Sequence, residues 1–237
     1  MKTTRQLRAI PARTIIAAGN FQLFKGSGPM IGTQIFPMTV ATAFERGLEA
    51  PVPYLVGSNS AEFPSNATAF ERNVAGTLML SPADCQAITT AYPDDATFMS
   101  DAIGDVVFGE PARMLAAHHA SNGHPTYLYR FSIISSSVRT LLTGTPHGQE
   151  LPYVFRHPGA TPWKTDNRDA SHAAITQAYW AAFVKTGDPN GEHRPDWPLY
   201  SADTDQLLDF TNEGPVATRV PHVDRFAVIA ARYSHRH

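Results

Sequence analysis

Two short apolar runs indicate the strands of a sheet. Residues 54–56 form an apolar run that ends in the polar stretch 57–60, and residues 125–133 are rich in aromatic and β-branched side chains. Both patterns are typical of strands. The first run has no polar face, which favours a parallel strand that is covered on both sides. A third strand is predicted near residues 207–210.

Apolar residues at helical spacing separate these strands. The spacing predicts a helix from about residue 100 to 121 and another from about residue 171 to a stop at Gly187. Pro111 should kink or split the first of these helices, because proline has no amide hydrogen to donate. Shorter helices are predicted up to about residue 16, over 82–92 and over 222–232, with an irregular loop over 26–37. Helix followed by strand, twice, predicts an α/β fold.

Charge, apolar runs and cysteine content each exclude a class of partner or site. The 237 residues carry 19 Lys and Arg against 21 Asp and Glu, a formal net charge of -2, with no long block of one sign. A chain of this kind lacks the basic surface that binds nucleic acid, so we expect no nucleic-acid partner. No apolar run reaches the ~18 residues of a transmembrane helix, so no membrane span is predicted. The single cysteine, Cys85, excludes an internal disulfide and a thiolate zinc site.

Three histidines lie close together in the sequence, at positions 118, 119 and 124. His118 and His119 are adjacent, so their side chains should leave a helix in different directions. No acidic residue follows either of them at a spacing of four. We therefore expect surface histidines rather than a metal set, and no metal or cofactor is predicted for the chain.

Glu62 and His147 are the candidate catalytic residues. Glu62 closely follows the strand at 54–56, and His147 lies in a turn-rich segment after the strand at 125–133. Open α/β sheets gather functional groups at the carboxyl ends of their strands. A carboxylate that binds one imidazole nitrogen leaves the other nitrogen free to accept a proton from a nucleophile. Taken alone, the same residues also fit a turn carboxylate and a loop histidine.

Four segments carry a resemblance to a known family. They are residues 52–62, which include Glu62, residues 144–155, which include His147, and residues 179–191 and 195–200. Together they resemble the C-terminal part of type B carboxylesterases, the family that also holds the cholinesterases.

The resemblance implies the C-terminal part of an α/β-hydrolase fold, with an incomplete central sheet and flanking helices, as a single partial domain over residues 1–237. It also implies hydrolysis of small-molecule carboxylic esters by a Ser-Glu-His triad, without metal or cofactor. Glu62 would be the acid, His147 the general base, and Glu150 a structural residue that holds the histidine segment.

The chain departs from the family pattern in two places. Phe63 follows the acid where the family usually has glycine, and no G-x-S-x-G motif occurs anywhere in the sequence. We therefore expect the nucleophile and the oxyanion loop to lie in an N-terminal half upstream of Met1, and the chain to be inactive alone. Three possibilities stay open: a truncated enzyme, one half of a split enzyme completed in trans, and an inactive remnant or interaction module.

Overall fold

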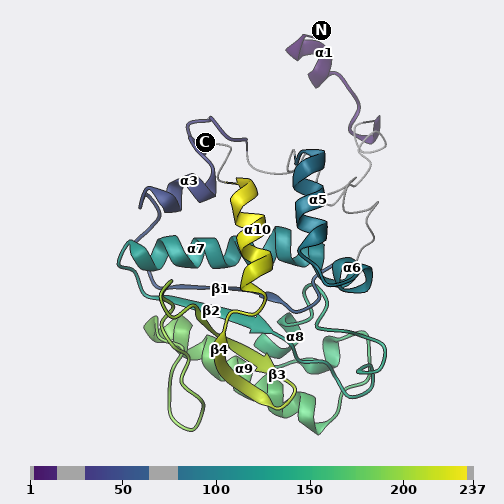
Figure 1. Ribbon diagram of the computed structural model, residues 1–237, viewed down its shortest axis with the longest axis vertical. Coiled ribbons are helices and arrows are strands. Elements are labelled where there is room, and N and C mark those ends of the chain that lie inside the picture. Colours follow the sequence, from purple (N-terminus) through teal and green to yellow (C-terminus); the bar gives the residue numbers. More distant parts are fainter. Residues whose placement is uncertain (1–2, 15–29, 64–79, 234–237) are drawn as a thin grey trace.

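A four-stranded sheet forms the centre of the molecule. The computed structural model describes residues 3–14, 30–63 and 80–233 (Figure 1). The sheet has the order β1-β2-β3-β4. Its strands are β1 (Tyr54–Asn59), β2 (Thr126–Phe131), β3 (Gln206–Thr211) and β4 (Gly214–Arg219). The first three strands are parallel and β4 runs antiparallel to β3, so the sheet is mixed.

Helices cover both faces of this sheet. One face carries α5, α6, α7 and α10, and the opposite face carries α8 and α9 (Figure 1). The helices are α1 (Thr4–Arg8), α3 (Val40–Glu45), α5 (Pro82–Thr90), α6 (Asp95–Gly104), the π-helix η2 (Asp105–Gly109), α7 (Glu110–Ser121), α8 (Leu151–Val154), the short 3-10 helix η3 (Pro158–Ala160), α9 (Asn167–Thr186) and α10 (Val223–Tyr233). This layering confirms the predicted α/β architecture.

Alternation along the strands divides the core into two clusters. Val56 lies opposite Leu128 in the β1–β2 register, and both pack toward α5, α7 and α10. Leu55 lies opposite Tyr127, and these residues pack toward α9. Successive side chains of a strand point to opposite faces of the sheet. The β1–β2 register therefore places Val56 and Leu128 in one cluster and Leu55 and Tyr127 in the other. The second cluster is mainly aromatic, with Tyr153, Tyr179, Trp197 and Phe210 at its centre.

The three predicted strands are present, and β1 is longer than predicted. It continues through residues 57–59, which the sequence indicated as a turn. Gly57 lies within the strand. The position requires glycine because a Cβ there would collide with the carbonyl oxygen and ring of Tyr129 on β2. The glycine is therefore a close-packing position in the sheet rather than the start of a turn.

Strand β4 was not predicted. Four of its six residues are exposed and it contains Pro215. Proline is tolerated on an edge strand, where its missing amide costs no ladder hydrogen bond. The strand forms by hairpin pairing with β3, so a tertiary contact creates it and its apolar pattern stays weak.

Pro111 splits the predicted helix in a specific way. The helical stretch begins at Asp95, earlier than predicted, because Asp94 caps its first turn. It then passes through the π-helix η2 before α7 begins just ahead of Pro111. A proline cannot donate to the carbonyl four residues back, and π-helical turns form where this ladder is interrupted.

The remaining helix predictions hold with shifted ends. Helix α9 starts at Asn167 because Asp166 and Asp169 form a capping box, and Gly187 ends it with a φ of 77°. The first helix is Thr4–Arg8, residues 12–14 are helical again, and residues 15–29 lie outside the described part. Residues 30–38 hold no helix or strand, as predicted for that part of the loop over 26–37. Within the described ranges, no helix combines the length and apolar character needed to cross a bilayer.

Glu110 generates a prediction about stability and pH. The residue is 3% exposed, and its Oε2 has no hydrogen-bond partner among the described residues. Burial raises the pKa of Glu110 to about 7, although the charge of Arg113 opposes the rise. The folded state therefore holds this proton to higher pH than the unfolded chain does. Its stabilising effect is complete below about pH 4 and is lost as the pH rises through 7.

We expect Glu110→Gln to reduce this pH dependence. The free energy of unfolding, measured by urea denaturation at pH 5 and pH 8, should differ between the two pH values by about 2 to 3 kcal/mol less in the variant than in the parent chain. Glu213→Gln, at an exposed turn position, is the matched control and should leave the difference unchanged. Equal pH dependence in all three proteins would contradict the assignment.

Candidate active site

The candidate acid lies in a tight turn at the carboxyl end of β1. Glu62 is three residues beyond the end of the strand, and its side chain is 5% exposed. Its Oε1 accepts a hydrogen bond from the backbone amide of Asn59 at 2.7 Å. This bond holds the Glu62 carboxylate against the last residue of the strand and fixes Oε1.

Backbone hydrogen bonds join this turn to the histidine segment. The amide of Ala61 donates to the carbonyl of Thr145 at 3.1 Å, and the amide of His147 donates to the carbonyl of Glu62 at 3.1 Å. The amide of Thr145 also donates to Ser60 Oγ at 2.9 Å. The two turns are therefore held together through their main chains, independently of the two candidate side chains.

Glu62 and His147 meet directly, although 85 positions separate them. The Nδ1 of His147 lies 2.6 Å from Oε2 of Glu62. Burial raises the pKa of Glu62, while the hydrogen bonds from Asn59 and His147 act in the opposite direction. The carboxylate is thus costly to ionise, and these two donors are what support its charge.

The imidazole is placed to exchange protons with a further group. Its side chain is 49% exposed, whereas its partner is buried. No hydrogen bond to Nε2 occurs within the described residues. With Nδ1 held by a carboxylate, Nε2 is the nitrogen that can accept a proton and later release it.

Asn59 and Glu150 brace the histidine segment. The Nδ2 of Asn59 donates to the carbonyl of Pro146 at 2.9 Å and makes a further, very short hydrogen bond to Oε2 of Glu150. Glu150 therefore links the residues after His147 to the end of β1, in line with the structural role expected for it.

Two aromatic rings lie against the imidazole. The ring centroid of Phe63 is 4.4 Å from that of His147, and the centroid of Phe108 is 5.1 Å away. Phe63 is not among the residues with positive φ, so its backbone does not require the glycine that is usual in the family. Phe108 belongs to the π-helix η2, and π-helical turns are frequent beside functional sites. No local pattern in the sequence singles out Phe108.

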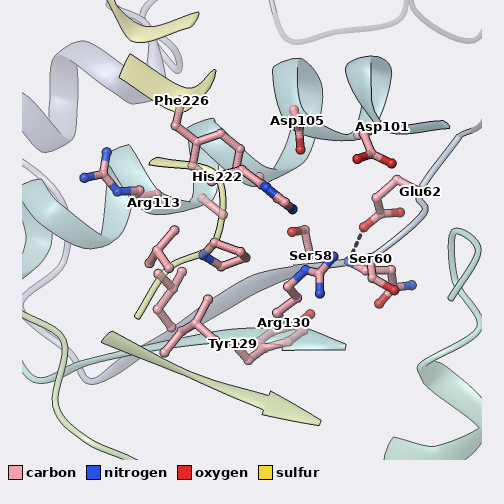
Figure 2. A pocket seen from close by; sticks show the side chains of 18 of the residues that line it. Ser58, Ser60, Glu62, Asp101, Asp105, Arg113, Tyr129, Arg130, His222 and Phe226 are labelled. Atoms are coloured by element: carbon pink, nitrogen blue, oxygen red, sulfur yellow. Dashed lines mark hydrogen bonds between the residues drawn. The ribbon is translucent and has the colours of Figure 1, made fainter. Parts of the chain in front are cut away.

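A polar cavity lies on the acid side of the pair. Its lining includes Glu62 but not His147. Figure 2 shows Ser58 and Arg130 from the strands facing Asp101 and Asp105 on the helix above them. Two of its charged groups are paired with residues outside the lining, since Arg225 Nη1 lies 3.0 Å from Asp101 and Arg130 Nη1 lies 3.4 Å from Asp209. The chemistry of a proton carrier therefore lies at the exposed imidazole rather than in this cavity.

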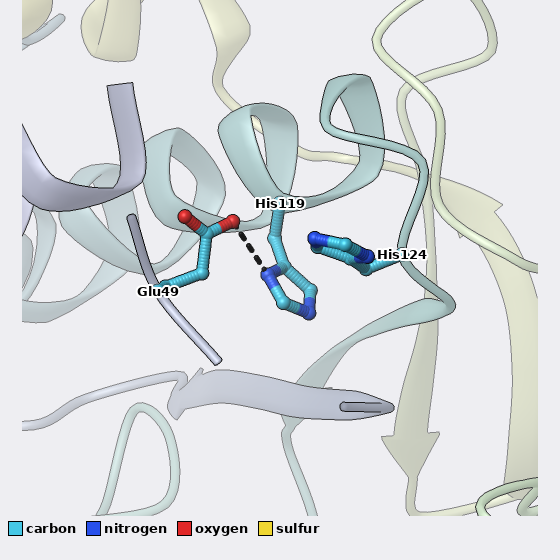
Figure 3. Close-up of side chains that lie close together, drawn as sticks. All are labelled: Glu49, His119 and His124. Carbon is cyan, nitrogen blue, oxygen red and sulfur yellow. Dashed lines mark hydrogen bonds and ion pairs between the residues drawn. The ribbon is translucent and has the colours of Figure 1, made fainter. Parts of the chain in front are cut away.

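The expectation of three surface histidines is wrong for His119. Its side chain is 2% exposed, and its Nδ1 lies 2.9 Å from Oε1 of Glu49. His124 packs beside it, with ring centroids 4.8 Å apart (Figure 3). The acidic partner lies 70 positions away, just ahead of β1, so a search at helical spacing could not find it. His118 stays partly exposed, as expected.

Comparisons with known proteins point to one family. A model described as the carboxylesterase family matches residues 86–225, which include His147 and begin after Glu62. Liver carboxylesterase of Sus scrofa is 29% identical over 187 residues, covering 66% of this chain and 32% of that protein. Carboxylesterase 4A of Bos taurus is 26% identical over 219 residues, covering 81% and 40%.

Solved structures agree with these matches. The crystal structure of Aspergillus niger EstA has a TM-score of 0.71 and 25% identity, and the match covers 84% of this chain and 43% of that one. A structure of PNB esterase has 19% identity and a TM-score of 0.70. Both structures have the α/β-hydrolase fold, and the similarity shows the same fold for this chain. The chain spans less than half the length of each of these four proteins.

Gly144 generates a prediction about the geometry of the pair. A Cβ at this position would lie 2.6 Å from Ser60 Oγ and 2.9 Å from the Cβ of Ala61. Gly144→Ala should therefore push the histidine segment away from the acid turn and destabilise the fold by about 1 to 3 kcal/mol. We expect the low-field proton resonance of the His147 Nδ1–H group to broaden or disappear in the NMR spectrum.

Gly159→Ala is the matched control for this substitution. Nothing lies within 4 Å of a Cβ at Gly159, and its φ is not in the positive range. The control should keep both the resonance and the stability of the parent chain. An unchanged resonance in Gly144→Ala would show that the two turns are not packed as described.

Proposed function

The chain belongs to the carboxylesterase family, and we propose that it supplies the histidine and the acid of a Ser-Glu-His triad that hydrolyses carboxylic esters. The observation that carries the proposal is the 2.6 Å contact between His147 Nδ1 and Glu62 Oε2. The contact lies at the carboxyl ends of two adjacent parallel strands, where α/β folds place reacting groups.

His147 would act first as a base and then as an acid. Its Nε2 would take the proton of a serine hydroxyl while the serine oxygen attacks the carbonyl carbon of the ester. The same nitrogen would then give that proton to the departing alcohol. Water would repeat the sequence on the acyl-serine and release the carboxylate.

Glu62 would orient the ring and stabilise its charged form. The carboxylate holds Nδ1, which fixes the tautomer with a free Nε2. A buried carboxylate that is costly to ionise gains most from a positive neighbour. The imidazolium formed during proton transfer would be that neighbour, so the carboxylate would stabilise the charged intermediate.

The nucleophile and the oxyanion donors would come from a segment outside these 237 residues. The two serines nearest the acid do not fit the role, since neither has flanking glycines on both sides, and Ser60 Oγ accepts a bond from Thr145. In the described part of the chain, β1 ends the sheet and has only β2 as a neighbour. The missing segment would add its strands at this edge, whether it is joined to this chain or made separately.

An interaction module without activity is the alternative. The absence of a G-x-S-x-G motif from the sequence favours it. Such a module would still bind a complementary segment at β1, but its imidazole would have no serine to activate. Binding and turnover must therefore be measured separately.

Complementation tests the proposal. The chain should be produced together with the N-terminal half of a family member that carries G-x-S-x-G, and hydrolysis of a short-chain nitrophenyl ester should be followed. We expect turnover that a serine-reactive inhibitor abolishes. His147→Ala should lower kcat by roughly 10³-fold or more, and Glu62→Gln should lower it by roughly 10² to 10⁴-fold.

The control variant is His193→Ala, since that histidine is 94% exposed and far along the chain from the pair. It should keep full turnover. Turnover that is equally high in His147→Ala would contradict the triad. A stable complex that forms without turnover, although the serine reacts with the inhibitor, would favour the interaction module.

A further inference from the structure

The cluster of Glu49, His119 and His124 points to a second site. We propose that these three residues bind a divalent transition-metal ion of the Zn²⁺ class. One ligand atom from each residue lies within 4.8 Å of the others (Figure 3). The cluster lies at the amino end of β1, whereas the candidate triad residues lie beyond its carboxyl end. The inference does not depend on the proposed esterase activity.

His119 is already held as metal-binding histidines are held. Its Nε2 lies 2.8 Å from the carbonyl oxygen of Val52, and a carbonyl can only accept, so Nε2 carries a proton. The nitrogen left for an ion is Nδ1, which faces Glu49. A backbone carbonyl that fixes the tautomer in this way is a recurrent support of a metal-ligating imidazole.

Metal binding would replace one proton. Without an ion, the 2.9 Å contact between Nδ1 and Oε1 of Glu49 needs one proton between the two atoms, carried by either group. A divalent cation between Nδ1 and the carboxylate would displace that proton. The positive charge that balances Glu49 would then be supplied by the ion.

The carboxylate of Glu49 is held in place by a hydrogen bond, and one of its oxygens can still accept a ligand. Glu49 is 6% exposed in its side chain, and Asn122 Nδ2 donates to its Oε1 at 3.0 Å. Its Oε2 is buried and has no hydrogen-bond partner among the described residues. Such an oxygen gains from a ligand that offers positive charge.

The donor set selects the class of ion. Two imidazole nitrogens and one carboxylate oxygen suit Zn²⁺ or Co²⁺, whereas Mg²⁺ and Ca²⁺ prefer oxygen ligands throughout. Three protein ligands leave a fourth position for water. The rings of Phe44 and Tyr54 lie 5.6 and 5.3 Å from His119 and keep that side apolar, while His124 is partly exposed and gives access to the ion.

A bound ion would join two segments that are distant in the sequence. Glu49 precedes β1, and the histidines lie at and just beyond the end of α7. The ion would link these two segments at the amino end of β1 and raise the melting temperature of the chain as its free concentration rises above the Kd.

Titration of the metal-free chain of 237 residues with Zn²⁺ tests the inference. The tail histidines 235 and 237 should first be replaced by alanine, because they offer an unrelated site for the ion. We expect binding of one ion per chain with a Kd in the micromolar range or tighter, and a higher melting temperature. Co²⁺ should give the intense visible absorption of a four-coordinate site.

His124→Ala should weaken Zn²⁺ binding at least tenfold, because it removes one of three ligands. His118→Ala is the matched control, since it removes the adjacent histidine of α7, and it should bind as the parent does. Glu49→Gln keeps the size of the side chain and should also weaken binding, with circular dichroism reporting that the fold is intact.

Two results would overturn the proposal. One is the absence of Zn²⁺ binding below 1 mM, which would leave an ion pair with no metal function. The other is equal affinity in His124→Ala and His118→Ala, which would place the bound ion elsewhere on the chain.

Discussion

The parallel pairing of β1 with β2 is the interaction on which the candidate site depends. The register places Asn59 opposite Phe131, and the next amide, that of Ser60, still donates to the Phe131 carbonyl at 2.9 Å. The chain segments that follow the two strands therefore leave the sheet at the same level and on neighbouring paths. Gly57 permits this pairing because β1 and β2 approach too closely there for a side chain.

Sequence reasoning succeeded where the signal was local or carried by the family resemblance. The apolar runs of β1, β2 and β3 are continuous, and Glu62 and His147, which each follow such a run, lie in contact. What the sequence could not give depends on tertiary contacts: an exposed edge strand at β4, the ring of Phe108, and a carboxylate brought to His119 from 70 positions away. The spacing of apolar residues along the sequence cannot reveal contacts between residues that are far apart in it.

Buried charge concentrates on one side of the sheet. Toward α6, η2 and α7, the carboxyl ends of the strands carry several charged groups, among them Arg130 paired with Asp209, while the Glu49–His119 pair lies at the amino end of β1. Burial also raises the pKa of Asp105, in η2, to about 6. Charges are costly in a protein interior, and proteins retain them where they serve a site or await a partner. Asp105 and Glu62 line the same cavity, so these charges lie beside the candidate acid.

The exposed half of the imidazole fixes how a nucleophile must approach. Nδ1 faces the buried Glu62, while the His147 side chain as a whole is 49% exposed. Phe63 and Phe108 lie against the ring and are themselves 5.7 Å apart, so the three rings form one packed group. A hydroxyl that exchanges a proton with Nε2, as proposed, would approach in the plane of the ring, along the direction of the nitrogen lone pair. Phe63 and Phe108, which pack against the imidazole, would therefore also limit the directions from which such a hydroxyl could approach.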